Sequence, residues 1–406
     1  MEQKSINNQQ KNEYKLSTLY AICLVMMFAV EIAFGHSTGL YTVLMTGSIL
    51  VTTWMFLRST SRIPPFCIFV CAYCFIVPFL VSLSGNDIQD VPMTMVSLLL
   101  PFVLSSKPIN TDNVEKTCWV VSVAMILLNS FKSIIPVLRD MNINSYTFLI
   151  YMGLAAALIL LHYKKSIWTI LLNFYAVFIT MNAGSRNAFI VAVLIFVVSL
   201  LPYPVLSRPL VYRLIYALSL SYQIFSLSFL EYVETNSFLT GIFENYVQPY
   251  FNKSWGIESR VNLYSGVAEE IWKQDIVKLL FGNGRAFFHA HNGFYQMIFI
   301  YGLIGTIFIL AMYAYIFEMG LKVVRKKHNH LVMGCVIAMC SLFLMQGADV
   351  FLLGVKSCKF VPFLLVGIIL SEYYRLHEEE KAQKDEEIEA FKDQIRKNNA
   401  IKSESS

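Results

Sequence analysis

The sequence predicts an all-α fold: a polytopic integral membrane protein of about twelve transmembrane helices, with one large loop outside the membrane. Two observations carry this prediction. The chain of 406 residues is 56% hydrophobic and 15% charged, whereas soluble domains of average composition carry about 25% charged residues. Its apolar residues also gather in about twelve runs, each near the roughly 20 residues that a helix needs to cross a bilayer.

The predicted spans follow one another along the chain, at residues 18–35, 39–57, 66–84, 92–105, 117–137, 145–162, 166–181, 188–203, 210–230, 294–318, 331–352 and 359–374. The fourth run is short and the fifth ends at Lys132 and Pro136, so eleven spans is the alternative count. Residues 1–17 form a polar tail, and the polar and apolar parts together are too long for a cleaved signal peptide, so the first run is interpreted as a retained span. We therefore expect a tail at 1–17, a transmembrane domain at 18–374 with its large loop at 231–290, and a charged tail at 375–406.

The basic residues predict the orientation of the chain. If the N-terminus is cytoplasmic, most of the 32 Lys and Arg residues lie in cytoplasmic segments, including the short loops with Lys164-Lys165 and Arg325-Lys326-Lys327. The outer turn at 84–91 contains no basic residue. Because cytoplasmic loops are enriched in bases, both tails are expected inside and loop 231–290 outside. The net charge of +5 then reflects orientation, and no nucleic-acid partner is expected.

The eight cysteines predict neither a disulfide framework nor a zinc site. Cys67, Cys71 and Cys74 share one face of the third span, Cys335 and Cys340 lie in the eleventh, and the large loop has none. Three thiols at that spacing could bind a soft metal, but small buried packing residues are the favoured interpretation.

The C-terminal tail predicts a solvated helix with paired charges such as Glu380 and Lys384. Ile388, Phe391 and Ile395 supply barely one heptad, which is fewer than a coiled coil requires. Self-association through this tail is the alternative.

Loop 231–290 contains a predicted surface helix at 261–280. Its apolar residues gather near one face and its charged residues on the others, a pattern typical of a helix that lies on the membrane surface over the bundle. The apolar set is Val261, Tyr264, Ala268, Ile271 and Trp272, and the charged set is Glu269, Glu270, Lys273 and Asp275. Gly282-Asn283-Gly284 ends this helix.

The chain then passes Arg285, His289 and His291 and enters the tenth span, for which Asn292 is the expected N-cap. The N-terminus of that span carries a positive partial charge and is suited to holding a phosphate. A titratable imidazole at the edge of the bilayer predicts chemistry on a substrate at the membrane surface. The alternative for His291 is a structural role as a cap or a headgroup contact.

Three arginines are expected on the same outer side. Arg186 follows Asn182-Ala-Gly-Ser185 at the turn between the seventh and eighth spans, Arg260 opens the surface helix, and Arg285 precedes His291. Guanidinium groups bind phosphate oxygens two at a time, so convergence of these arginines would form a diphosphate site. Snorkelling to lipid headgroups is the alternative for each of them.

These strings resemble the O-antigen polymerase and O-antigen ligase superfamily over residues 145–370. Gly184-Ser185-Arg186 resembles the Ser-Arg motif of that family. Arg260, Leu280-Phe-Gly-Asn-Gly284, His291-Asn292 and Gly302-Leu-Ile-Gly305 resemble its signature around the large periplasmic loop. The resemblance implies a metal-independent, inverting glycosyltransferase in the bacterial inner membrane, with a periplasmic active site. Its substrate would be an oligosaccharide on undecaprenyl diphosphate, and membrane lipid would surround the protein.

The residues suit that chemistry. His291 would deprotonate the acceptor hydroxyl, Arg186 and Arg260 would stabilise the departing diphosphate, and the substrate-binding residues would be Ser185, Arg285, His289 and Asn292. The chain contains no Asp-x-Asp, so no metal site and no cofactor are expected. Gly302 and Gly305 are expected to permit close helix packing.

The family leaves two functions open. A polymerase joins the growing glycan to the next lipid-linked repeat, and a ligase joins the finished glycan to a lipid A core. Ser185-Arg186-Asn187-Ala188 and Phe281-Gly-Asn-Gly284 favour the polymerase, because ligases usually carry Ser-Arg-Gly-Ala. A chain-length regulator or a lipid A core acceptor would be the further partner. A lipid-linked oligosaccharide flippase is a third function, disfavoured because only Asp349 and Glu31 are candidate midplane charges.

Overall fold

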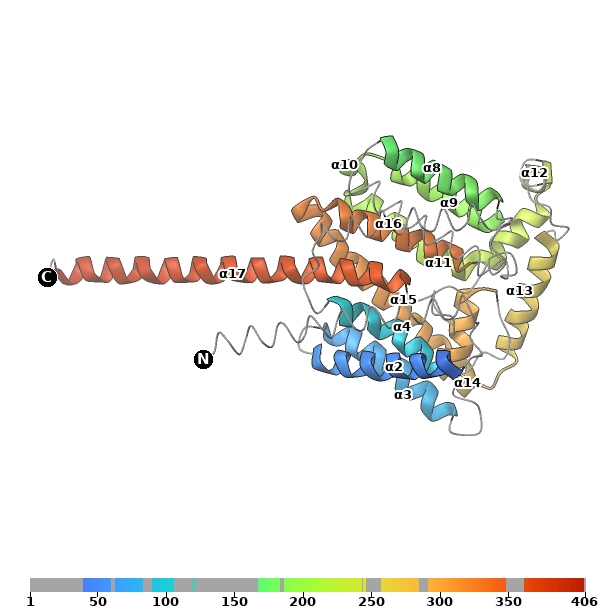
Figure 1. Ribbon diagram of the computed structural model, residues 1–406, viewed down its shortest axis with the longest axis horizontal. Helices are drawn as coiled ribbons and strands as arrows, with labels where there is room; N and C mark the ends of the chain where they lie inside the picture. The colour runs from blue at the N-terminus through green and yellow to red at the C-terminus, as the bar shows by residue number, and fades with distance from the viewer. Residues whose placement is uncertain are drawn as a thin grey trace.

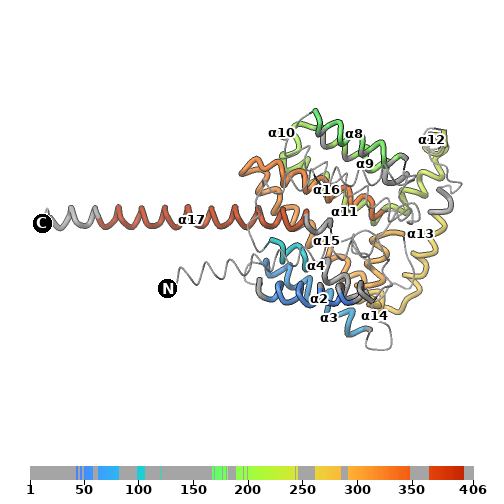
Figure 2. Tube along the Cα trace, viewed as in Figure 1, coloured from blue at the N-terminus to red at the C-terminus, as the bar shows by residue number. Residues whose placement is uncertain are grey.

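The structure is a computed structural model that describes residues 39–59, 63–82, 90–105, 120, 167–182, 186–242, 244–245, 257–284, 291–347 and 361–404. Within these residues every element is a helix and there is no strand, which confirms the predicted helical class. The helices pack into a bundle from which the last one projects as a long rod (Figure 1 and Figure 2).

The described helices are α2 (Gly39–Ser59), α3 (Pro65–Ser82), α4 (Asp90–Ser105), α8 (Ile167–Asn182), α9 (Arg186–Ser199), α10 (Tyr203–Leu206), α11 (Pro209–Thr235), α12 (Ser237–Ile242), α13 (Ile257–Trp272), α14 (Ile276–Phe281), α15 (Gly293–Lys327), α16 (His330–Met345) and α17 (Val361–Glu404). The predicted apolar runs within the described residues coincide with α2, α3, α4, α8, α9, α11, α15, α16 and the start of α17. The runs 18–35 and 145–162 lie outside the described residues, as does 117–137 apart from residue 120.

The centre of the bundle is formed by α15 and α16. Almost every side chain of α16 is buried, and Phe343 on this helix makes edge-to-face contacts with Tyr313 and Phe317 of α15. Cys67, Cys71 and Cys74 of α3 are also buried, as the packing interpretation expected. This core holds α15 in a fixed position relative to the helices around it.

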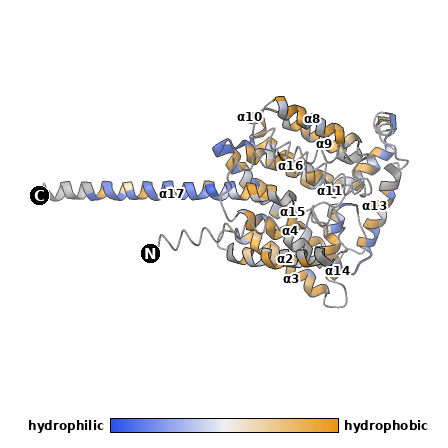
Figure 3. Cartoon of the chain, in the orientation of Figure 1, coloured by the Kyte–Doolittle hydropathy of each residue, from blue (hydrophilic) through white to orange (hydrophobic). Residues whose placement is uncertain are grey.

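The outer helices of the bundle expose large apolar side chains. Two described helices, α11 and α15, are long and apolar enough to cross a membrane, and α3, α8, α9 and α16 contain shorter apolar stretches. Exposed apolar residues on the outer helices include Leu50, Leu57, Phe69, Leu80, Trp168, Phe174, Leu194, Leu218 and Phe225. Figure 3 shows the apolar colour across the bundle and the hydrophilic colour along the outer part of α17.

The bundle has two chemically different ends. At the first, called the α13 end, lie α12, α13, α14 and the N-terminus of α15 (Figure 1). At the second, called the α17 end, α15 finishes with Arg325, Lys326 and Lys327, and α17 leaves the bundle. Lys326 and Lys327 form ion pairs with Glu380 and Glu379 of α17. The predicted tail is therefore helical, and the same helix runs without a break across the predicted boundary at residue 375.

The predicted surface helix at 261–280 is wrong in one respect, because the segment forms two helices. α13 ends at Trp272, and the side chain of Asp275 caps α14 by accepting hydrogen bonds from the backbone N–H groups of Val277 and Lys278, at 3.1 and 3.0 Å. The N–H of Lys278 contributes most to holding the pKa of this carboxyl below its usual value. A new helix nucleates there because the cap satisfies two of the backbone donors that a helix start leaves free.

The assignment of Trp272 to the packed face of that helix is also wrong. Tyr264, Val267 and Ile271 of α13 are buried against α15, whereas the Trp272 side chain is 70% exposed. A residue one position after Ile271 is rotated by about 100° around the helix axis. At the end of α13 that rotation is enough to move the indole off the packed face.

The helix at the predicted tenth span, α15, also differs from its prediction. It extends to Lys327 rather than ending at 318, and its helical geometry is interrupted at Gly302, which has φ +70° and ψ 177°. Gly302 therefore does more than let two helices approach each other. It breaks α15 about three turns after its start.

Candidate functional site at the start of α15

The N-terminus of α15 is the centre of the candidate site, and Asn292 caps it as predicted. The Asn292 Oδ1 accepts hydrogen bonds from the N–H groups of Phe294 at 2.8 Å and Tyr295 at 3.1 Å. Its Nδ2 donates to the Ser226 Oγ at 2.7 Å and to the carbonyl oxygens of Gln223 at 3.1 Å and Gly347 at 3.3 Å. One buried side chain thus joins α11, the start of α15 and the end of α16.

A buried polar cluster surrounds this cap. Gln223, Ser226, Asn292 and Gln346 are all buried, and the Gln346 carbonyl accepts a 2.7 Å hydrogen bond from the N–H of Gly293. A Cβ on Gly293 would lie 2.2 Å from the Gln346 Oε1 and 2.9 Å from the Gln346 Cβ, so a larger residue here would displace the Gln346 side chain. Because buried polar groups lose stability when they lack partners, the cluster stabilises one arrangement of the three helices.

His291 lies directly before this cap and is held through its backbone. Its φ is +49°, in the left-handed region that residues other than glycine rarely adopt. The hydroxyl of Tyr264 on α13, a fully buried side chain, donates a 3.0 Å hydrogen bond to the His291 carbonyl oxygen. His291 itself is partly buried. The tertiary structure therefore stabilises an unusual backbone conformation at the residue predicted to act as the base.

The glycine loop after α14 packs backbone-to-backbone against the break in α15. The N–H of Asn283 donates to the Phe299 carbonyl at 2.8 Å, and the N–H of Gly284 donates to the Ile300 carbonyl at 3.1 Å. A Cβ on Gly282 would lie 2.4 Å from the Ile300 oxygen, and one on Gly302 would lie 2.3 Å from the Leu280 oxygen. These two glycines, from strings that are separate in the sequence, therefore form a single contact.

Gly305 behaves differently from Gly302. A Cβ at Gly305 would lie 3.2 Å from the Tyr73 Cε1, so this glycine lets α15 pack closely on α3. That role is the close helix packing that the sequence predicted.

The remaining predicted site residues are described only in part or not at all. Arg186 is the first residue of α9, whose N-terminus is at the α13 end, and Arg260 lies in the first turn of α13, one turn before Tyr264. Ser185, Arg285 and His289 lie outside the described residues. Convergence of the arginines on His291 stays a prediction. Among the residues that the structure describes, no group of three His, Cys, Asp or Glu side chains could hold a metal ion.

Sequence reasoning missed the residues that support the site. The apolar pattern places Tyr264 on an apolar face of the surface helix, and it predicts no role for Gln223, Ser226 and Gln346. A signal was present for the last three, because polar side chains inside predicted apolar spans are costly unless they meet one another or serve a function.

Comparisons with known proteins identify no family for this chain. No protein-family model matches the chain, and no curated protein is significantly similar to it.

Proposed function

We propose that this chain is a polytopic inner-membrane glycosyltransferase that acts on glycans carried by undecaprenyl diphosphate, and that it polymerises lipid-linked repeat units at the periplasmic face. Exposed apolar side chains on α2, α3, α8, α9 and α11 support contact with lipid. The cluster of bases at the α17 end supports a cytoplasmic position for that end, and therefore a periplasmic position for the α13 end.

The observation that carries the proposal is the placement of His291. It stands immediately before the capped N-terminus of a long apolar helix, in a strained backbone held by Tyr264 and above a buried polar cluster. Strained, over-determined residues gather at functional sites. An imidazole is suited to take a proton near neutral pH, and the start of α15 carries the positive partial charge that favours an anion.

In the proposed reaction the acceptor hydroxyl oxygen attacks the anomeric carbon of the lipid-linked sugar. His291 takes the hydroxyl proton as the new glycosidic bond forms. The bond from the anomeric carbon to the diphosphate oxygen breaks, and the lipid diphosphate departs with the electron pair. Arg186 and Arg260, with Arg285, stabilise that negative charge, while Ser185, His289 and Asn292 contribute to substrate binding.

The ligase remains the second candidate, since the same chemistry would serve a lipid A core acceptor. The strings Ser185-Arg186-Asn187-Ala188 and Phe281-Gly-Asn-Gly284 favour the polymerase.

A deletion strain distinguishes the candidates. Loss of a polymerase should leave single repeat units on the surface, loss of a ligase should strand long lipid-linked chains at the inner membrane, and loss of a flippase should abolish the surface polysaccharide. Re-expression of the parent chain should restore long chains. A deletion strain with unchanged surface polysaccharide would remove the proposal altogether.

A further inference from the structure

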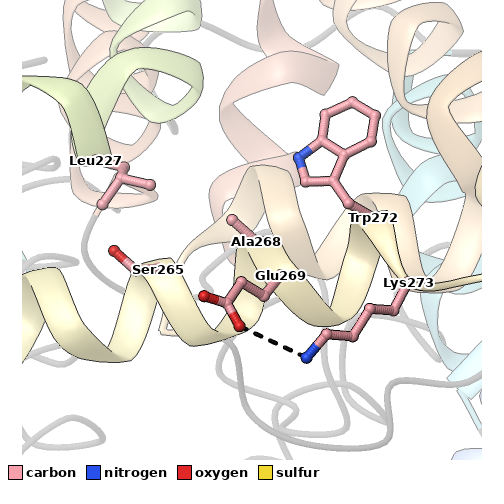
Figure 4. Close-up of a pocket in the computed structure, with 6 residues that line it drawn as sticks. All are labelled: Leu227, Ser265, Ala268, Glu269, Trp272 and Lys273. Carbon is pink, nitrogen blue, oxygen red and sulfur yellow. Dashed lines mark ion pairs between the residues drawn. The ribbon is translucent and has the colours of Figure 1, made fainter.

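Trp272 lies beside an open hollow at the α13 end. The hollow has a volume of about 410 Å³ and is lined by Leu227 of α11 and by Ser265, Ala268, Glu269, Trp272 and Lys273 of α13 and the turn after it. In Figure 4, Ser265, Ala268 and Trp272 project from the same side of α13, towards the side on which Leu227 lies. The carboxylate of Glu269 and the ammonium of Lys273 form an ion pair at 3.5 Å on the rim of the hollow.

Packing does not account for the position of this indole. The face of α13 that packs on the bundle consists of Tyr264, Val267 and Ile271, which are buried, whereas Trp272 is 70% exposed. An exposed apolar side chain of this size lacks the packing contact that burial would give it. An occupant of the hollow would recover that contact.

The hollow matches the two-sided chemistry of a sugar ring. A pyranose presents C–H groups on its faces and hydroxyls around its edge, so it stacks on a flat aromatic surface while its edge hydrogen-bonds. Trp272, Ala268 and Leu227 offer the apolar contact. The Glu269 carboxylate can accept from a hydroxyl, the Lys273 ammonium can donate to one, and the Ser265 hydroxyl can do either. A few polar groups around a mostly apolar hollow are typical of small-molecule sites.

We propose that this hollow is a glycan subsite in which one sugar ring stacks on Trp272. The inference rests on the proposed function and extends it. Trp272 follows Tyr264, the residue that contacts His291, by two turns of α13, which is a rise of about 12 Å. The bound sugar is therefore not the reacting one but a residue farther along the glycan. Binding of a sugar at such a distance increases the affinity for the glycan, but that sugar takes no part in bond formation.

The test compares Trp272→Ala with Trp272→Phe and with Ile276→Ala in the full-length protein in nanodiscs. Ile276 is a matched control, because it is 65% exposed and begins the next helix, α14, but does not line the hollow. Trp272→Ala should raise KM for the lipid-linked glycan by about tenfold or more and leave kcat within about twofold. Trp272→Phe should raise KM much less than Trp272→Ala, since an aromatic ring is retained. Ile276→Ala should have the KM and kcat of the parent. Little effect on folding is expected, because the replaced side chain is exposed.

A second measurement does not depend on catalysis. Oligosaccharides released by mild acid from the strain's own surface polysaccharide should change the tryptophan fluorescence of the parent protein saturably, and that change should vanish in Trp272→Phe. Saturable, Trp272-dependent binding without any transfer activity would retain the subsite and refute the proposed function. Unchanged KM and unchanged fluorescence in an active enzyme would refute the subsite alone. If Ile276→Ala raises KM as much as Trp272→Ala does, the surface contacts lipid and the subsite is wrong.

Discussion

At the scale of single residues, the site depends on how the backbone of His291 is held. A left-handed residue other than glycine persists only where its surroundings over-determine it. Here the Tyr264 hydroxyl holds the carbonyl of His291, and the next residue, Asn292, is fixed by contacts to three helices. The backbone on either side of the imidazole is therefore held by contacts to α11, α13 and the end of α16.

His291→Ala is expected to abolish glycan transfer and leave folding intact. The substitution removes the proposed base, and His291 is partly exposed outside the apolar core, so the cost in stability should be small. Polysaccharide ladders on gels, with the amount of membrane-inserted protein measured in parallel, check this outcome. Normal ladders from a stably expressed variant would exclude His291 from the mechanism.

Arg186→Lys and Arg260→Lys are expected to lower turnover by at least about tenfold, or about 1.4 kcal/mol of transition-state stabilisation. A diphosphate is gripped by the planar guanidinium fork, which lysine cannot reproduce, whereas an arginine that only snorkels needs no more than a positive charge. Arg139→Lys, at a predicted outer turn without a motif, is the control and should have no effect. Full activity in both test variants would favour snorkelling.

The purified enzyme is expected to keep its activity in excess chelator. In the proposed mechanism Arg186, Arg260 and Arg285 supply the positive charge that stabilises the departing diphosphate, so no divalent ion is required. Transfer assays before and after chelator measure this directly. Activity that is lost in chelator and returns with magnesium or manganese would show that the charge stabilisation has another source.

At the scale of elements, α15 and the loop after α14 form one unit. The break at Gly302 frees backbone groups near Phe299 and Ile300, and the loop at Asn283 and Gly284 donates hydrogen bonds to their carbonyls. Phe299 and Ile300 are buried, and unsatisfied backbone groups are costly in a buried position, which explains why the break and the loop occur together. This contact holds the loop that leads towards His291 against the bundle.

Gly302→Ala is expected to destabilise the protein by on the order of 2 kcal/mol or more, because its backbone conformation suits only glycine. In addition, the new Cβ would lie 2.3 Å from the Leu280 carbonyl oxygen. Gly266→Ala is the matched control: Gly266 lies in α13 with no atom within 4 Å of an added Cβ, so stability should be unchanged or slightly raised. Thermal unfolding in detergent compares the two. Equal melting temperatures for the Gly302→Ala variant and the parent would contradict the contact.

At the scale of the whole molecule, the two ends of the bundle differ in charge and shape. The α17 end carries the bases of α15 and the projecting rod of α17, and the α13 end carries the short helices around His291 (Figure 1). In the proposed topology the first end lies in the cytoplasm and the second in the periplasm.

Trypsin is expected to cut the two ends from opposite sides of the membrane. In inside-out vesicles it should remove the outer part of α17, where Lys392 and Arg396 are exposed. In right-side-out vesicles it should cut near Lys273 and Lys278 and leave the tail intact. Mass spectrometry of the fragments identifies the cut positions. Cleavage at both ends from the same side would overturn the topology.

The sequence alone determined where the long apolar helices of the described residues lie and how α15 is capped. Both depend on local chemistry: runs of apolar residues specify these helices, and the Asn292 side chain reaches N–H groups two and three residues away. The sequence also marked His291, Arg186 and Arg260 as candidates, through their strings. It did not indicate which helix faces pack against each other. Both α3 and α16 are apolar on all sides. In the structure, however, α16 is buried, whereas α3 exposes Phe69 and Leu80.

Only the tertiary structure decided the contacts around the site. The Tyr264 hydroxyl meets a carbonyl 27 residues away, and the Asn292 amide meets Ser226, 66 residues away. The pairing of Gly282 with Gly302 and the exposure of Trp272 likewise depend on how α13, α14 and α15 pack. Such contacts depend on how helices that are distant in the chain pack together. An apolar pattern does not predict that packing, because an apolar helix face suits lipid and a protein interior equally well.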